Sequence, residues 1–170
     1  MRNNMLETVI DAVVEALTDA GISAGPAYPK TGVERSGGGF VRVGVAKVVD
    51  TNAGFARYLG VENDPESGPR EVYGLRCALE LSLDVYAPLR EENAALKCAA
   101  LFDSAAAVIA AVGGLQVREL SCGAPGPDRE TGLFRLAGGV RCAALLTASG
   151  ADGEDMAFTD YVLRGELRAT

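Results

Sequence analysis

Two groups of carboxylates come nearest, in this sequence, to the spacing of a catalytic or metal-binding site. Glu91 and Glu92 are adjacent, and Asp152, Glu154 and Asp155 lie close together near the C-terminus. Carboxylate oxygens suit hard cations, so either group would be compatible with a metal-using enzyme. The first pair, however, falls in the opening turn of an expected helix, where acids suit the helix dipole. The second group lacks the spacing of an EF-hand loop, which favours a solvated turn.

The sequence lacks histidine and the familiar phosphate-binding motifs. It contains no histidine, which removes the commonest general base, the usual zinc ligand and both common catalytic triads. Neither of the two familiar phosphate-binding glycine motifs is present. The glycine run at 37–39 precedes an expected strand, so it has no helix N-terminus to hold an anion. We therefore expect a protein that is not an enzyme and uses no cofactor or metal.

The cysteines are more typical of buried thiols than of a metal site. None belongs to a C-x-x-C pair, and a zinc site would require paired spacing or histidine ligands. Each lies in an apolar or strand-like stretch, which predicts buried, reduced thiols in a reducing compartment. The residues concerned are Cys77, Cys98, Cys122 and Cys142.

The composition predicts one soluble, acidic domain. The chain has 170 residues, a net charge of −7 and a pI near 4.7, and its 16 basic residues are scattered. Such a chain does not attract phosphate backbones by bulk electrostatics, and would instead repel DNA that slides past it. No run approaches the ~20 apolar residues of a membrane helix, and the amphipathic N-terminus is not a signal peptide. We expect a single domain over 1–170, without membrane contact.

A strand over 72–86 is the strongest structural signal. Its apolar residues fall on every second position, and the polar residues Arg76, Glu80 and Asp84 lie between them. Pro88 ends the strand, because proline cannot donate to a ladder. The apolar set is Leu75, Cys77, Leu79, Leu81, Leu83 and Val85.

The remaining pattern completes an α-β-β-α-β-β-β order. The predicted class is α+β, with a mostly antiparallel open sheet and two helices on one face. Irregular loops are expected at 22–39 and 50–70. A break is expected at Gly138-Gly139. The predicted helices span 4–20 and 90–112, and the other predicted strands span 40–49, 115–122, 133–147 and 158–167.

Several segments carry a resemblance to a known family. A helix of the type Leu6–Leu17 opens the chain, and Val85-Tyr86-Ala87-Pro88 leads directly into an alanine-rich helix. Gly113-Gly114-Leu115-Gln116-Val117 follows, and then a turn of the form Gly123…Asp128…Thr131-Gly132-Leu133-Phe134. In this order, from Met5 to Leu167, the chain resembles the tail-terminator and related minor tail proteins of long-tailed bacteriophages and prophages.

The resemblance implies a virion structural protein made in the bacterial cytoplasm. Proteins of this kind are small α+β subunits, commonly hexameric rings that cap the tail tube and meet the head-tail connector. The implied partners are other copies of the chain, the tail tube and the connector. DNA would pass through without specific binding.

Candidate contact residues follow from the charged positions. An ordinary hydrated sheet face explains the alternating charges on the strands, and a subunit interface or ring lumen is the sharper interpretation. Our candidates are Arg76, Glu80 and Asp84 on the long strand and Arg35, Arg57 and Arg70 in the loops. The alternative function is a small-ligand or peptide-binding α+β module whose ligand lies on the open sheet face.

Overall fold

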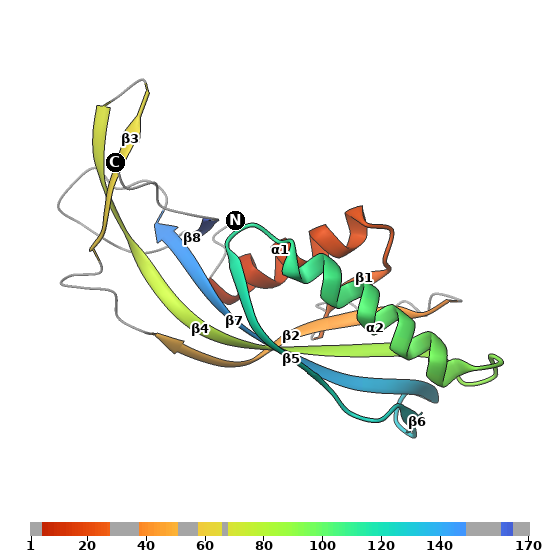
Figure 1. The fold of residues 1–170 in the computed structure, drawn as a ribbon. Coiled ribbons are helices and arrows are strands. Elements are labelled where there is room, and N and C mark those ends of the chain that lie inside the picture. The colour runs from red at the N-terminus through yellow and green to blue at the C-terminus, as the bar shows by residue number, and fades with distance from the viewer. Residues whose placement is uncertain (1–4, 28–37, 51–57, 66–67, 149–160, 165–170) are drawn as a thin grey trace.

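The computed structural model describes residues 5–27, 38–50, 58–65, 68–148 and 161–164 (Figure 1). Within these residues, two helices and eight strands form an α+β fold, which confirms the predicted class. The helices are α1 (Met5–Asp19) and α2 (Ala94–Ala110). The strands are β1 (Ala24–Pro26), β2 (Phe40–Asp50), β3 (Tyr58–Asp64), β4 (Gly68–Pro88), β5 (Leu115–Cys122), β6 (Gly126–Asp128), β7 (Leu133–Ala148) and β8 (Tyr161–Arg164).

The sheet is built around β4 and β7, which pair along almost their whole lengths. The strand order is β1-β2-β4-β7-β5, and every pairing is antiparallel except that of β1 with β2. Along β4, β2 pairs with residues 77–86 and β3 with residues 68–73. The side of β7 away from β4 pairs with β6, β5 and β8 in succession. The predicted mostly antiparallel sheet is therefore confirmed.

The core lies between the two helices and one face of the sheet (Figure 1). The apolar residues of β4 that alternate in the sequence are all buried, as the period-2 pattern predicts. α1 contributes Val9, Val13 and Leu17, which share one face of the helix at intervals of four residues. The prediction of two helices on one face of the sheet is confirmed, and none of the described helices or strands covers the other face, here called the open face.

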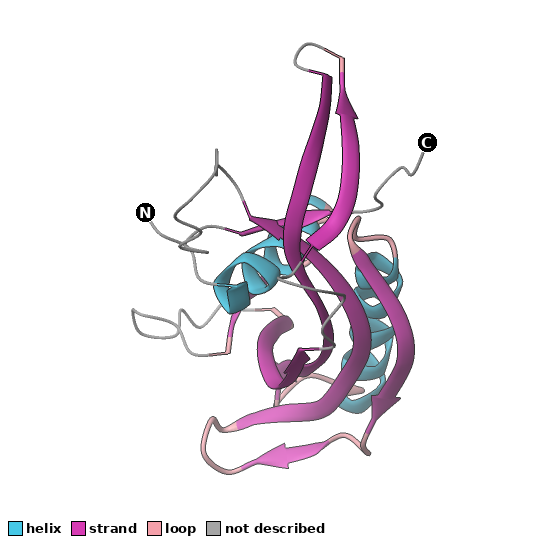
Figure 2. Ribbon diagram, turned by 90° about the vertical axis from the view of Figure 1, so that its left-hand side faces the viewer, coloured by secondary structure: helices cyan, strands magenta, loops and turns pink. Residues whose placement is uncertain are grey.

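The prediction of an irregular loop at 50–70 is wrong over much of that range. β3 occupies Tyr58–Asp64 and forms a hairpin with the start of β4, which begins at Gly68 rather than Val72. The turn-forming residues near Pro65 mark the tip of this hairpin and not an irregular loop. The hairpin projects away from the rest of the fold (Figure 2). Within the other predicted loop, β1 forms at Ala24–Pro26.

The second helix starts later than the sequence predicts. Asn93 has a left-handed backbone with φ 63°, which asparagine tolerates better than most residues, and α2 begins after it. Glu91 and Glu92 therefore lie in the turn before the helix, so the prediction that they occupy its first turn is wrong. Glu91 instead pairs with Lys97, with 2.7 Å between carboxylate oxygen and Nζ.

The predicted break at Gly138-Gly139 does not occur, because β7 runs without interruption through both glycines. A Cβ atom at Gly138 would overlap the ring of Phe102 on α2. The absence of a side chain at Gly138 therefore lets α2 pack closely against the sheet. β8 lies inside the strand predicted at 158–167, whose ends fall outside the described residues.

Candidate functional site

The open face of the sheet brings together charged residues from four strands. Side chains alternate along β4, so Arg76, Glu80 and Asp84 lie on the face opposite the helices. Two rows of alternating charge cross this face from strand to strand.

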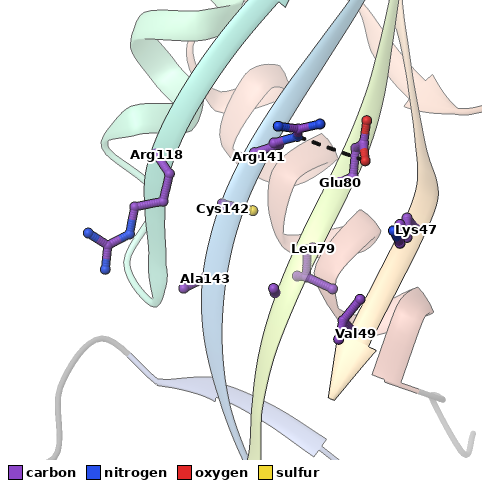
Figure 3. A pocket seen from close by; sticks show the side chains of 9 residues that line it. Lys47, Val49, Leu79, Glu80, Arg118, Arg141, Cys142 and Ala143 are labelled. Atoms are coloured by element: carbon purple, nitrogen blue, oxygen red, sulfur yellow. Dashed lines mark ion pairs between the residues drawn. The ribbon is translucent and has the colours of Figure 1, made fainter. Parts of the chain in front are cut away.

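The first row, here called the Glu80 row, consists of Lys47, Glu80, Arg141 and Glu119. The sheet register sets Lys47 of β2 and Arg141 of β7 on either side of Glu80. Arg141 Nη1 donates to Glu119 Oε2 at 3.0 Å, and its Nε lies 4.0 Å from Glu80 Oε2 (Figure 3). These side chains are well exposed, so each pair contributes at most about 1 kcal/mol.

The second row, the Asp84 row, consists of Arg42, Asp84 and Arg135. Arg135 donates from Nε and Nη2 to the same Asp84 oxygen, at 3.0 and 2.8 Å. Arg42 of β2 lies directly opposite Asp84, whereas Arg135 lies diagonally across from it, opposite Tyr86. The Arg42 guanidinium lies 5.1 Å from the centre of the Phe40 ring. Phe40 stacks on Tyr86 with ring centres 5.0 Å apart. The row is therefore held by ion pairing and by ring contacts.

The pKa shifts on this face have structural causes. The hydrogen bond from Arg135 to Asp84 raises the pKa of the guanidinium. Burial, with a smaller contribution from Asp84, raises the pKa of the Tyr86 hydroxyl. Both shifts keep each group in its ordinary protonation state at neutral pH, so neither group is activated for acid–base chemistry.

A groove of about 420 Å³ lies on the open face around the Glu80 row (Figure 3). Small side chains, Ala78 and Ala143, leave the space, and charged side chains surround it. Register shifts flank the groove between Val45 and Lys47 in β2 and between Val117 and Glu119 in β5. The lining residues are Lys47, Val49, Ala78, Leu79, Glu80, Arg118, Arg141, Cys142 and Ala143.

The groove presents no activated nucleophile. Burial raises the pKa of the Cys142 thiol to about 11, so the thiol stays protonated at neutral pH. The groups that remain are cations and one carboxylate, which can bind a charged partner but do not form a catalytic pair with a base.

Thiol reactivity tests which of the four cysteines are buried. Cys77, Cys98 and Cys142 are buried and Cys122 is exposed, so the prediction of buried thiols is wrong for Cys122, at the end of the edge strand β5. We expect one thiol to react rapidly with a disulfide reagent at pH 8, and all four in denaturant. Cys122→Ser should remove the rapid phase. A second rapid phase in the native wild type would contradict the burial described here.

The predicted contact residues fall into three groups according to where the structure places them. Arg76, Glu80 and Asp84 share the open face, and their role in an interface stays a prediction. Arg70 was predicted in a loop and lies instead in β4, opposite Glu62 in the hairpin. Arg35 and Arg57 fall outside the described residues.

Sequence reasoning missed Arg42, Lys47 and Glu119 as members of the charge rows. Alternation along β2 would place Arg42 and Lys47 on opposite faces, because Lys47 is five positions after Arg42, an odd number. The register shift after Val45 restores Lys47 to the open face. No signal in the sequence identifies that shift.

The metal-binding candidates receive no support from the described residues. In the part of the chain with described structure, no group of three or more His, Cys, Asp or Glu is arranged to hold a metal ion. Asp152, Glu154 and Asp155 lie outside that part. None of the described helices is both long enough and apolar enough to span a membrane.

Comparison with known proteins does not assign this chain to a family. No protein-family model matches this chain, and no curated protein matches it.

Proposed function

We propose that the chain is a structural subunit of a long-tailed phage or prophage, similar to a tail terminator. It forms a ring at the end of the tail tube and joins the tube to the head connector. The observation that carries the proposal is the open sheet face, where two rows of alternating charge cross several strands without a catalytic group among them.

The size of this face suits a subunit contact. From Arg76 to Tyr86 it is about 33 Å long, and the four strands from β2 to β5 make it about 19 Å wide, or roughly 600 Å². A stable protein interface buries about 800 Å² on each partner. The face could thus supply most of one side of an interface, with its charges fixing the register between subunits.

The β3–β4 hairpin is a second feature that favours assembly (Figure 2). Tyr58 is 39% exposed and Val61 is 44% exposed, although both lie in a strand. A two-stranded hairpin by itself is only marginally stable in water. Contact with a neighbouring subunit or with the tail tube would cover these side chains and stabilise the hairpin.

The acidic character of the chain agrees with a passage for DNA. With a net charge of −7, the subunit repels phosphate backbones on average, so DNA leaving the head would pass without adhering. This role requires no enzyme activity and no cofactor. The protein would be made in the bacterial cytoplasm and would function in the virion tail.

The groove favours one alternative function, a small-ligand or peptide-binding module. Its volume of about 420 Å³ falls within the ~300–1,000 Å³ of ligand pockets. A peptide with both charges could pair with Arg141 and Glu80. Saturable heat release on titration with charged peptides, by a protein that stays monomeric, would favour this function over the first.

Electron microscopy tests the proposed function. We expect negatively stained images of the heaviest species to show closed rings with a central opening, near six copies in each ring. Open filaments or irregular aggregates would argue against a ring-forming subunit.

A further inference from the structure

The two faces of the molecule carry opposite charge, beginning with an acidic stripe on α1. Glu7, Asp11, Glu15 and Asp19 recur at intervals of four residues, and α1 contains no lysine or arginine. The core residues of α1 lie on the other side of the helix, so the carboxylates point away from the sheet. Asp11, Glu15 and Asp19 are exposed.

This stripe is unfavourable for an isolated helix. Like charges four residues apart repel one another along the helix surface. Asp19 also lies in the last turn, where the helix dipole disfavours a negative charge and the turn itself contains no basic residue. A cationic surface placed against α1 would relieve both effects.

The open sheet face offers such a surface. It carries six cations and four carboxylates, a surplus of positive charge in a chain whose net charge is −7. The cations are Arg42, Lys47, Arg76, Arg118, Arg135 and Arg141, and the carboxylates are Glu80, Asp84, Glu119 and Asp128. The helices and this face lie on opposite sides of the sheet (Figure 1).

We propose that copies of this chain associate head to tail, with the acidic stripe of α1 in one copy against the open sheet face of the next. A two-fold dimer through either surface would place that surface against the same surface of the second copy, so that like net charges would repel. A head-to-tail contact instead pairs opposite charges. Such a contact uses two different surfaces and therefore closes into a ring or continues as a filament. The inference rests on the proposed function and names the surfaces that build the ring.

The dimensions of the two surfaces agree. Asp11 and Asp19 are eight residues apart on α1, or about 12 Å along the helix. Lys47 on β2 and Arg118 on β5 are three strand spacings apart, or about 14 Å. A helix lying across the strands brings both carboxylates within reach of these two flexible side chains.

Complementary charge reversal tests the contact in the full-length chain. The helix variant carries Asp11→Lys and Glu15→Lys, and the sheet variant carries Lys47→Glu and Arg118→Glu. All four side chains are exposed, so both variants should fold, as circular dichroism would check. Each variant alone should raise the dissociation constant of self-association at least about a hundredfold, because like charges then face each other. An equimolar mixture should recover wild-type association, since both kinds of contact again pair opposite charges.

Matched controls carry the same change in net charge elsewhere. Glu92→Lys with Asp103→Lys controls for the helix variant, and Arg90→Glu with Arg129→Glu controls for the sheet variant; all four residues are exposed. Both controls should associate as the wild type does.

Three outcomes would overturn the proposed contact. The contact is refuted if either reversal variant keeps the wild-type mass, if the mixture stays dissociated, or if the controls dissociate as strongly. If a reversal variant keeps the wild-type mass while the wild type still forms rings, the contact is refuted and the proposed function stands. If the mixture recovers association but forms only open filaments, the contact is supported and the ring is refuted. A wild type that is monomeric at every concentration refutes both.

Discussion

Replacing Gly74 with valine is expected to lower the free energy of unfolding by about 3 kcal/mol. Gly74 is buried in β4 opposite Thr147 of β7. A Cβ atom there would overlap the carbonyl oxygen of Leu146 and lie 2.9 Å from Leu59 Cδ1. Because the obstructing atom belongs to the backbone of a paired strand, the clash cannot be relieved by rotating a side chain. The two central strands would have to separate.

Urea denaturation followed by circular dichroism measures this effect. Gly126→Val is the matched control, because Gly126 also lies in a strand and a Cβ atom there meets open space. We expect the control to keep a midpoint close to that of the wild type. If the two variants unfolded at the same urea concentration, the close approach of β4 and β7 at Gly74 would be wrong.

Replacing Leu83 with alanine is expected to cost about 3 kcal/mol, within the ~2–5 kcal/mol typical of buried leucines. Leu83 is 0% exposed and belongs to the core between the sheet and the helices. The substitution removes apolar contacts and leaves a cavity, because paired strands on both sides of β4 prevent the site from collapsing. The midpoint of urea denaturation should fall accordingly.

Leu96→Ala provides the comparison for Leu83. Leu96 is 69% exposed on α2, so its truncation should leave stability nearly unchanged. Equal losses in the two variants would mean that the apolar side of β4 does not face the helices. This pair of variants therefore tests whether the alternating apolar residues of β4 face the helices.

The long strand was predictable because its alternation is a local property of the sequence. Every second residue from Leu75 to Val85 is apolar, and each of these residues is buried. The first residues of β4 were not predictable in this way, since Gly68-Pro69 carries the signature of a turn. Their strand geometry depends on pairing with β3, where Pro69 lies opposite Asn63. That pairing is a tertiary contact that no local pattern contains.

The candidate site was predictable only as a set of positions on one face. Alternation alone assigns Glu80 and Asp84 to the polar side of β4. Their partners depend on the register of neighbouring strands: Arg135 lies 51 residues from Asp84 in the chain. The shift between Val45 and Lys47 changes which face Lys47 occupies, so a prediction without the register assigns Lys47 to the wrong face.

The central claim is that this chain is a ring-forming subunit, and its mass in solution tests that claim most directly. Light scattering behind a sizing column, over a wide range of protein concentration, gives the mass of each species. We expect a discrete species of about six copies of the 17.6 kDa chain that persists as the concentration falls. A mass of 17.6 kDa at every concentration would contradict the claim.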